Sequence, residues 1–155
     1  MSQEEKFEPK ELAKLKRLLR MAVDQFVKAV NCRPPEKLHP MLSKILFPRC
    51  TLSFVPLQVK TRSSEKIIKF WQEERKKGLT DFKLTIRDFA IGPLKKTVEQ
   101  AGKRSKFDAR GIVTGRYSYV KKEISAPPRD PDGFFSLEFC HREDCSWWLE
   151  NQIYY

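Results

Sequence analysis

The sequence contains little that would support a metal centre, a disulfide framework or a membrane segment. Its four cysteines form no CxxC pair and it has only two histidines, so we expect free thiols, no bound metal and no cofactor. No apolar run approaches the roughly 18 residues of a membrane span. The first residues, MSQEEK, are too polar for a secretory signal. We therefore expect an intracellular protein, cytoplasmic or nuclear.

Acidic residues are scarce relative to basic ones. The chain has 31 Lys and Arg against 20 Asp and Glu, which gives a formal net charge of +11. Such an excess favours acidic partners, including nucleic acid, anionic lipid headgroups and acidic protein surfaces. A well-solvated surface that binds no polyanion is the alternative interpretation. With 155 residues the chain fits one domain, which can bury a core without a metal or a disulfide.

Three helices are predicted in the first half of the chain. Between Pro9 and Val30, apolar residues recur at three- and four-residue steps and form one stripe: Leu12, Leu15, Leu19, Val23, Phe26 and Val30. A short second helix is expected from Leu38 to Phe47. A third is expected between a capping Ser63 or Ser64 and Gly78.

The rest of the chain predicts strands. Apolar residues alternate in two late segments: Phe135, Leu137 and Phe139, then Trp147, Leu149 and Ile153. Strands are also expected over 50–55 and 81–91, with a bulge where the apolar parity shifts at Phe89. We expect a mobile loop over residues 95–106 and a long curved strand over 107–122. Two turns are also expected: a proline-rich one over 125–133, and the turn of a closing hairpin at 143–144. Helices first and an antiparallel meander last is the order of an α+β fold.

Three local motifs accompany this order of elements. A helix from Leu38 runs into the segment FPRCTLSF, 47–54; a helix over 66–78 runs into a strand ending near Gly92-Pro93; and a hairpin closes the chain over 134–155. In these features the chain resembles the nuclear transport factor 2-like superfamily, which includes ketosteroid isomerase. The resemblance implies a curved, mostly antiparallel sheet wrapped round a long N-terminal helix with two further helices, a cone-like (cystatin-like) barrel. It covers 9–155 as a single domain, and 1–8 is expected to be a flexible N-terminus.

The resemblance does not extend to isomerase activity, because the residues that this reaction needs are absent. Isomerase-like members use an aromatic hydroxyl on the first helix, a carboxylate base after the first strand and an acid on a central strand. Here the first position holds Phe26, the first strand ends in Ser53-Phe54-Val55-Pro56, and residues 109–122 contain no Asp or Glu. Other charged or imidazole side chains could serve a different reaction, although nothing in their spacing forces them together: His39, His141, Asp88, Arg110, Arg116, Glu138 and Glu150.

The resemblance also implies an interior pocket and homodimerisation through the outer face of the sheet. Candidate pocket-lining residues are Phe26, Phe54, Trp71, Phe89 and Trp147. Because adjacent strand residues point to opposite faces, one of Trp147 and Trp148 should point inward and the other outward. Candidate interface residues are Trp148, Tyr117, Tyr119 and Tyr154.

Three functional hypotheses remain open on the sequence. The first is a non-enzymatic binding or scaffold domain, homodimeric, that engages a protein partner by its outer sheet face. The second is nucleic-acid association through two basic segments, with these candidate residues: Lys10, Lys14, Arg17, Lys95, Lys96, Lys103, Arg104 and Lys106. The third is a small-molecule enzyme of the dehydratase or cyclase type, which requires a buried ionisable group in an open pocket.

Overall fold

The structure, a computed structural model, describes residues 7–100, 102–122, 130–143 and 146–155; for residues 100 and 103 it describes the backbone alone. The elements follow one another in the order α1 (Pro9–Val30), η1 (Pro35–Lys37), α2 (Leu38–Leu42), β1 (Leu46–Phe54), η2 (Val55–Leu57), β2 (Val59–Arg62), α3 (Ser64–Lys76), β3 (Leu79–Gln100), β4 (Lys103–Lys121), β5 (Asp132–Arg142) and β6 (Ser146–Tyr154). The predicted order of helices and strands is confirmed.

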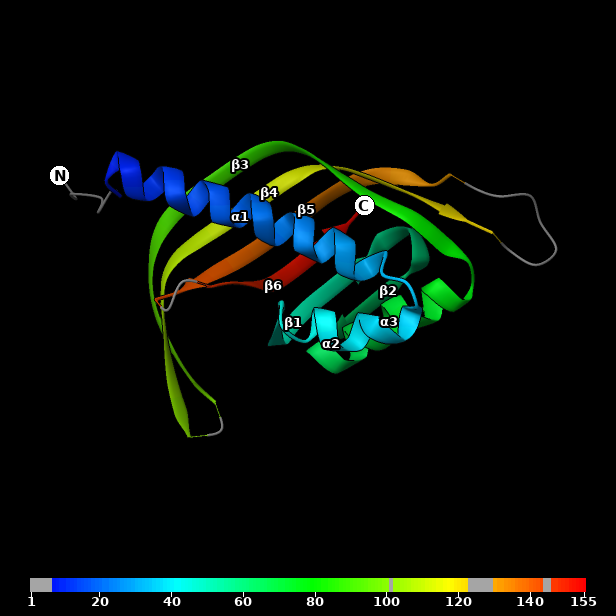
Figure 1. The fold of residues 1–155 in the computed structure, drawn as a ribbon, viewed down its shortest axis with the longest axis horizontal. Coiled ribbons are helices and arrows are strands. Elements are labelled where there is room, and N and C mark those ends of the chain that lie inside the picture. Colours follow the sequence, from blue (N-terminus) through cyan, green and yellow to red (C-terminus); the bar gives the residue numbers. More distant parts are fainter. Residues whose placement is uncertain (1–6, 101, 123–129, 144–145) are drawn as a thin grey trace.

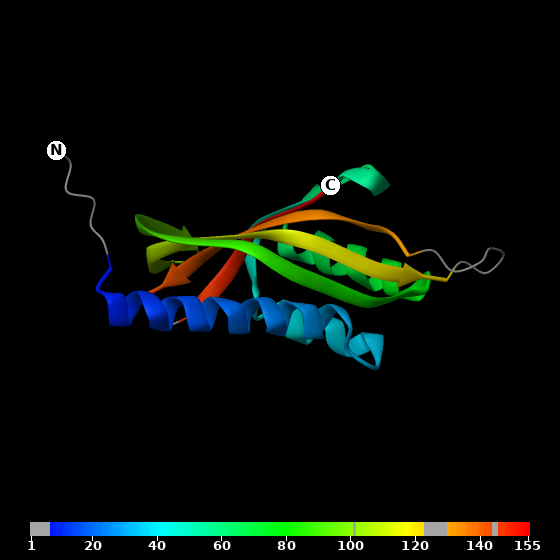
Figure 2. The same ribbon diagram turned by 90° about the horizontal axis from the view of Figure 1, so that it is seen from above.

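The strands form one six-stranded sheet with the order β2-β1-β6-β5-β4-β3. Neighbouring strands are antiparallel except β1 and β6, which run parallel. The sheet bends strongly around α1, and α2 and α3 cover the remaining part of its inner face (Figures 1 and 2). The expected curved, mostly antiparallel α+β cone is therefore present, and the sheet remains open rather than closing into a full barrel.

The predicted apolar stripe of α1 faces the sheet. Leu15, Leu19, Val23 and Phe26 are all buried, and the helix spans the predicted residues Pro9–Val30. Gly111 on β4 makes close packing possible, because a Cβ atom there would lie 2.4 Å from Cδ2 of Leu19. The helix thus rests directly on the backbone of the central strands, as one layer over a curved sheet.

The second helix is shorter than predicted. It ends at Leu42 instead of Phe47, and β1 begins at Leu46. The reason is tertiary pairing: the N–H of Leu149 donates to the carbonyl of Ile45 at 2.9 Å, and Leu46 pairs with Leu149. Strand pairing with β6 therefore takes these apolar residues away from the helix that their sequence favours.

The third helix has the predicted ends. The Ser63 hydroxyl oxygen accepts a hydrogen bond from the Lys66 N–H at 3.3 Å, which caps α3. After Lys76 the chain reaches Gly78 with φ of +98°, a left-handed conformation that glycine adopts without strain. The chain then enters β3 directly.

The prediction of a mobile loop over 95–106 is wrong. These residues continue β3 and β4 as a long hairpin, with pairing from Lys96–Phe107 to Gln100–Lys103. Strand pairs of this kind need backbone hydrogen bonds but no apolar side chains, so a charged segment can form them when it extends an established hairpin. The predicted bulge is confirmed by a register shift between Ile86 and Asp88.

Three other expectations concern residues that are only partly described. Residues 1–6 of the expected N-terminus, 123–129 at the expected proline-rich turn, and 144–145 in the closing turn lie outside the described residues. On either side of that closing turn, β5 and β6 pair from Arg142–Ser146 to Phe135–Tyr154.

Candidate functional site: a filled interior and an open outer sheet face

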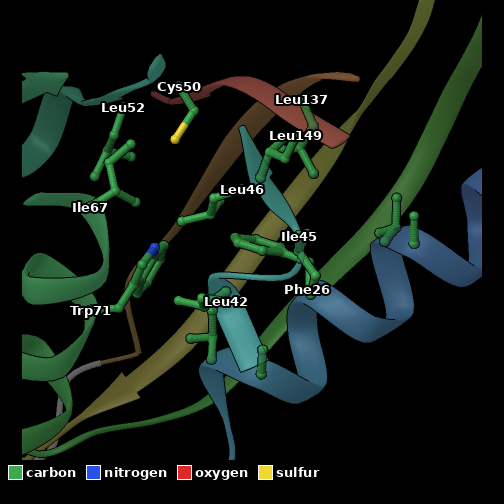
Figure 3. Packing of buried hydrophobic residues seen from close by; sticks show 14 of the residues in the cluster. Phe26, Leu42, Ile45, Leu46, Cys50, Leu52, Ile67, Trp71, Leu137 and Leu149 are labelled. Atoms are coloured by element: carbon green, nitrogen blue, oxygen red, sulfur yellow. The ribbon is translucent and has the colours of Figure 1, made fainter. Parts of the chain in front are cut away.

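The interior of the cone is packed with aromatic rings. Phe26, Phe54 and Trp71, three of the predicted pocket-lining residues, each have 0% exposure. The Trp71 ring lies edge-on to both phenylalanines, with centroids 6.2 Å from Phe26 and 6.3 Å from Phe54. In Figure 3, Trp71 from α3 and Phe26 from α1 lie among Leu42, Leu46 and other core side chains.

The other two predicted pocket residues lie apart from this centre. Phe89 is half-buried on β3, with the guanidinium of Arg20 5.2 Å from its ring centroid. Trp147 is buried towards α1 and packs against His141 at 4.9 Å. Cavities of about 560, 510 and 310 Å³ open elsewhere on the described chain, and none of them is lined by any of the five residues.

The buried polar or charged residues of the described chain are Glu74, His141 and Gln152. Tyr154 donates its hydroxyl hydrogen to Oε1 of Gln152 at 2.9 Å, and both residues have 0% exposure. Burial raises the pKa of Tyr154 well above its usual value, so the phenol stays protonated. The Nε1 of Trp71 and the Nε2 of Gln152 find no hydrogen-bond partner among the described residues. Next to the packed rings around Trp71 and Tyr154, the unpaired polar groups are therefore hydrogen-bond donors.

Three of the four predicted interface residues are core residues. Tyr117, Tyr119 and Tyr154 have 2%, 3% and 0% exposure, so the expectation that they line an exposed patch is wrong. For Tyr154 the cause is a bulge: the register between β5 and β6 shifts by one residue at Glu150, which turns Tyr154 inward instead of outward. Tyr117 and Tyr119 lie on the inner face of β4 with Val113.

Trp148 does face outward, as the alternation with Trp147 predicts. It is half-buried, donates from Nε1 to the Ser146 hydroxyl at 2.9 Å, and lies 5.7 Å from the guanidinium of Arg142. The sheet face that carries it is turned away from α1, and we call it the outer face. Trp147 on the same strand belongs to the core.

The outer face carries apolar side chains that the sequence analysis did not single out. Ile112 is 41% exposed and Phe134 is 52% exposed, and Ile153 is half-buried. Together with Trp148 they form what we call the outer patch. The alternation rule that separates Trp147 from Trp148 could have found two of them, because Ile112-Val113 and Phe134-Phe135 are also adjacent apolar pairs in strands.

Ion pairs flank the outer patch. Arg110 lies 3.0 Å from Glu138, Arg116 lies 3.4 Å from Asp132, and Lys96 lies 2.8 Å from Glu150. The last of these carboxylates also accepts a hydrogen bond from Sγ of Cys140.

The protonation states of this last cluster are fixed by its environment. Burial alone would raise the pKa of Glu150, but the hydrogen bonds from Cys140 and Lys96 and the positive charges of Lys96 and Arg110 lower it overall. Burial, followed by the hydrogen bond to the Glu150 carboxylate, raises the pKa of the Cys140 thiol to about 12. The thiol is therefore protonated and a poor nucleophile at neutral pH.

The remaining catalytic candidates are paired or exposed instead of converging. His141 is buried with its Nδ1 2.7 Å from Asp108, and its Nε2 has no partner among the described residues. The sequence analysis did not single out Asp108. This residue lies on β4, and it meets His141 on β5 only because the two strands pair. His39 and Asp88 are exposed. Asp108 of this pair lines the 560 Å³ cavity, whereas His141 itself lines none of the three cavities described above.

The basic candidates do not form one continuous face. Lys10, Lys14 and Arg17 are exposed on α1, away from the sheet, and none forms an ion pair with a described residue. In the hairpin, Arg104 pairs with Glu99 at 3.4 Å and Lys96 pairs with Glu150. Lys95, Lys96 and Lys106 line the 560 Å³ cavity at the start of α1, together with the acidic residues Glu8, Glu11, Asp108 and Glu143. The side chain of Lys103 lies outside the described residues.

The described residues show neither a metal-binding cluster nor a membrane-spanning helix. They contain no group of three or more His, Cys, Asp or Glu side chains that could hold a metal ion. They also contain no helix with both the length and the apolarity that crossing a bilayer requires.

A curved sheet wrapped around one long helix and completed by two shorter ones defines a class of α+β cone folds. Solved structures place the chain within that class. A nuclear transport factor 2-like superfamily protein from Salmonella enterica serovar Typhimurium has a TM-score of 0.65 at 9% identity, over 93% of this chain and 92% of that one. A nuclear transport factor 2-like protein with a cystatin-like fold from Novosphingobium aromaticivorans has a TM-score of 0.59 at 9% identity, over 93% and 82%.

A third structure, named as a calcium/calmodulin-dependent protein kinase II association domain from Xanthomonas campestris, has a TM-score of 0.54 at 14% identity, over 96% and 87%. No family model and no curated protein matches the sequence. The chain has the fold of the nuclear transport factor 2-like superfamily, as the resemblance of its sequence predicts.

Proposed function

We propose that this chain is a non-catalytic binding module that forms a homodimer through the outer face of its sheet. The observation that carries the proposal is the outer patch of Ile112, Phe134, Trp148 and Ile153 on a face that no helix of the described chain covers. A monomer gains nothing from exposing large apolar side chains together, and such patches commonly mark protein interfaces.

The arrangement around the patch has the anatomy of an interface. Small uncharged side chains lie within it, because Thr114 pairs with Ser136, and Ser136 pairs with Ile153. Glu138 also lies inside the patch, between Ile112 and Asn151 in the register of the sheet, and Arg110 neutralises its charge at 3.0 Å. A charge inside a protein interface is tolerated when it is paired.

The shape of the outer face suits a second copy of the same chain. The outer face has both protrusions, Phe134 and Ile112, and a hollow of about 510 Å³ beside Ile153, lined also by Ser53 and Arg62. In a two-fold dimer each copy can place its protrusion over the hollow of the other, because residue i contacts j and j contacts i. The solved relative that is named as an association domain is consistent with this proposal.

The distribution of charge favours the same face. Two chains of net charge +11 repel one another, and the repulsion falls steeply with distance in salt. The exposed lysines and arginines of α1 lie on the side of the molecule opposite to the outer face. Dimerisation through the outer face therefore keeps the basic faces of the two α1 helices apart. On the outer face itself, Lys60 and Arg62 line the hollow beside Ile153.

Light scattering coupled to size-exclusion chromatography tests this proposal. The wild-type protein should elute at twice the protomer mass of 18.3 kDa, and Ile112→Asp should elute at 18.3 kDa because it places a charge in the apolar centre. Met21→Asp is the matched control, since Met21 is 50% exposed on α1. A monomeric wild type, or equal disruption by Met21→Asp, would contradict the proposal.

A further inference from the structure

A cavity of about 310 Å³ opens where the ends of α1 and α3 meet the start of β3. Its wall includes Asn31 and Arg33 after α1, Arg75 in the last turn of α3, and Asp81, Phe82 and Lys83 on β3. Arg33 is far in sequence from Arg75 and Lys83, which lie on the consecutive elements α3 and β3. This cavity is separate from both the aromatic interior and the outer patch.

The framework of the cavity is held by hydrogen bonds. Asn31 donates from Nδ2 to the Phe82 carbonyl at 2.8 Å, and its Oδ1 accepts from the Phe82 N–H at 3.0 Å. Arg75 donates from one terminal nitrogen to the Val30 carbonyl at 2.5 Å. A guanidinium has five N–H donors, so this bond anchors Arg75 and leaves donors for a ligand. The edge of β3 at Phe82 is already paired by Asn31, so recognition here cannot use strand addition.

The cavity has an excess of positive charge. Arg33, Arg75 and Lys83 face a single carboxylate, Asp81, and none of the three cations forms an ion pair with a described residue. Two positive charges therefore remain uncompensated. The cavity at the start of α1 differs, because four carboxylates there face three lysines.

We infer that this cavity is a binding site for a terminal phosphate group. A phosphomonoester has a charge of about −1.5 to −2 at pH 7, which matches the two uncompensated charges. Guanidinium groups bind phosphate oxygens with paired N–H donors, and a lysine adds a point charge. A nucleic-acid backbone fits less well, since each diester has one charge. Binding of single strands also uses exposed rings, whereas Phe82, the ring at this cavity, has 0% exposure.

Titrations followed by amide NMR at low ionic strength test the inference. The probes are O-phosphoserine, inorganic phosphate, dimethyl phosphate as a monoanionic diester, and a short oligouridylate. We expect saturable shifts of the Asn31 side-chain amide and of the Phe82 and Lys83 backbone amides with the two monoester-type probes. Tighter binding of phosphoserine than of inorganic phosphate would identify a phosphorylated molecule as the ligand, and equal binding would identify the free ion.

Two double variants with the same change in net charge separate a site from general attraction. Arg33→Gln with Lys83→Gln should weaken phosphoserine binding about tenfold or more, because charged hydrogen bonds are lost. Both side chains are exposed, so the fold should survive. Lys14→Gln with Arg17→Gln on α1 should leave the affinity within about twofold. Equal losses in both variants, tighter binding of oligouridylate or dimethyl phosphate, or no saturable shift would each overturn the inference.

Discussion

The two faces of the sheet both carry aromatic and aliphatic side chains, but these are buried on the inner face and partly exposed on the outer face. On the inner face, Phe54 stacks on Tyr154 at 4.8 Å and the rings exclude water and any ligand. On the outer face, Phe134 is 52% exposed, and the guanidinium of Arg116 on β4 lies 5.4 Å from its ring centroid. Neighbouring strand positions thus supply a packed core on one side and a partly exposed apolar face on the other. That exposed face is where we propose that a second copy binds.

The largest difference between the faces should appear in stability. Phe54→Ala removes a ring with 0% exposure and should lower the free energy of unfolding by about 3–5 kcal/mol. Phe134→Ala, the matched change on the outer face, should cost less than about 0.5 kcal/mol. Urea denaturation of both variants in an Ile112→Asp background removes the contribution of self-association. Similar losses of unfolding free energy in the two variants would contradict the difference between a packed inner face and an exposed outer face.

Ion pairs should show the same contrast. Glu74 on α3 is 6% exposed and bonds to Lys121 on β4 at 2.9 Å, so Glu74→Ala leaves a buried ammonium unpaired and should cost about 3 kcal/mol. On the outer face, Asp132 and Arg116 have side-chain exposures of 64% and 48%, and Asp132→Ala should cost less than about 1 kcal/mol. Equal effects in thermal unfolding would show that the Glu74 pair is not closed to solvent.

The smallest effect concerns pH. Because the pKa of Glu150 is lowered in the folded state below its usual 4.5, its ionised form stabilises the protein above that pH, and this contribution disappears as the pH falls through the folded-state value. Glu150→Gln should therefore be less stable than wild type at pH 7, and this difference in unfolding free energy should be smaller at pH 3. Glu99→Gln is the control, because Glu99 is 74% exposed in its pair with Arg104. A Glu150→Gln difference that is the same at both pH values would contradict the lowered pKa.

Much of the fold could be predicted because its signals are local. The period of the apolar residues defines α1, the Ser63 cap and Gly78 define α3, and the parity shift before Phe89 reveals the bulge in β3. The short α2 and the hairpin over 95–106 could not be predicted in this way. Both depend on strand partners that are distant in sequence, and pairing overrides local preference there.

The candidate sites depended even more on distant contacts. One extra residue at Glu150 reverses the faces of everything that follows on β6, which is why Tyr154 belongs to the core and Ile153 to the outer patch. The residues of the proposed phosphate site, Arg33, Arg75 and Lys83, line one cavity because the ends of α1 and α3 meet the start of β3. No spacing along the chain could have indicated that cavity.

Methyl NMR on isoleucine-labelled protein tests the central claim most directly, since isoleucines report on both faces at once. Ile67 has 0% exposure in the core, whereas Ile112 and Ile153 lie on the outer face. On dilution, the Ile112 and Ile153 signals should shift, and at high concentration they should show contacts to the other copy, while Ile67 stays unchanged. Concentration-independent Ile112 and Ile153 signals, or shifts centred on Ile67, would contradict the account.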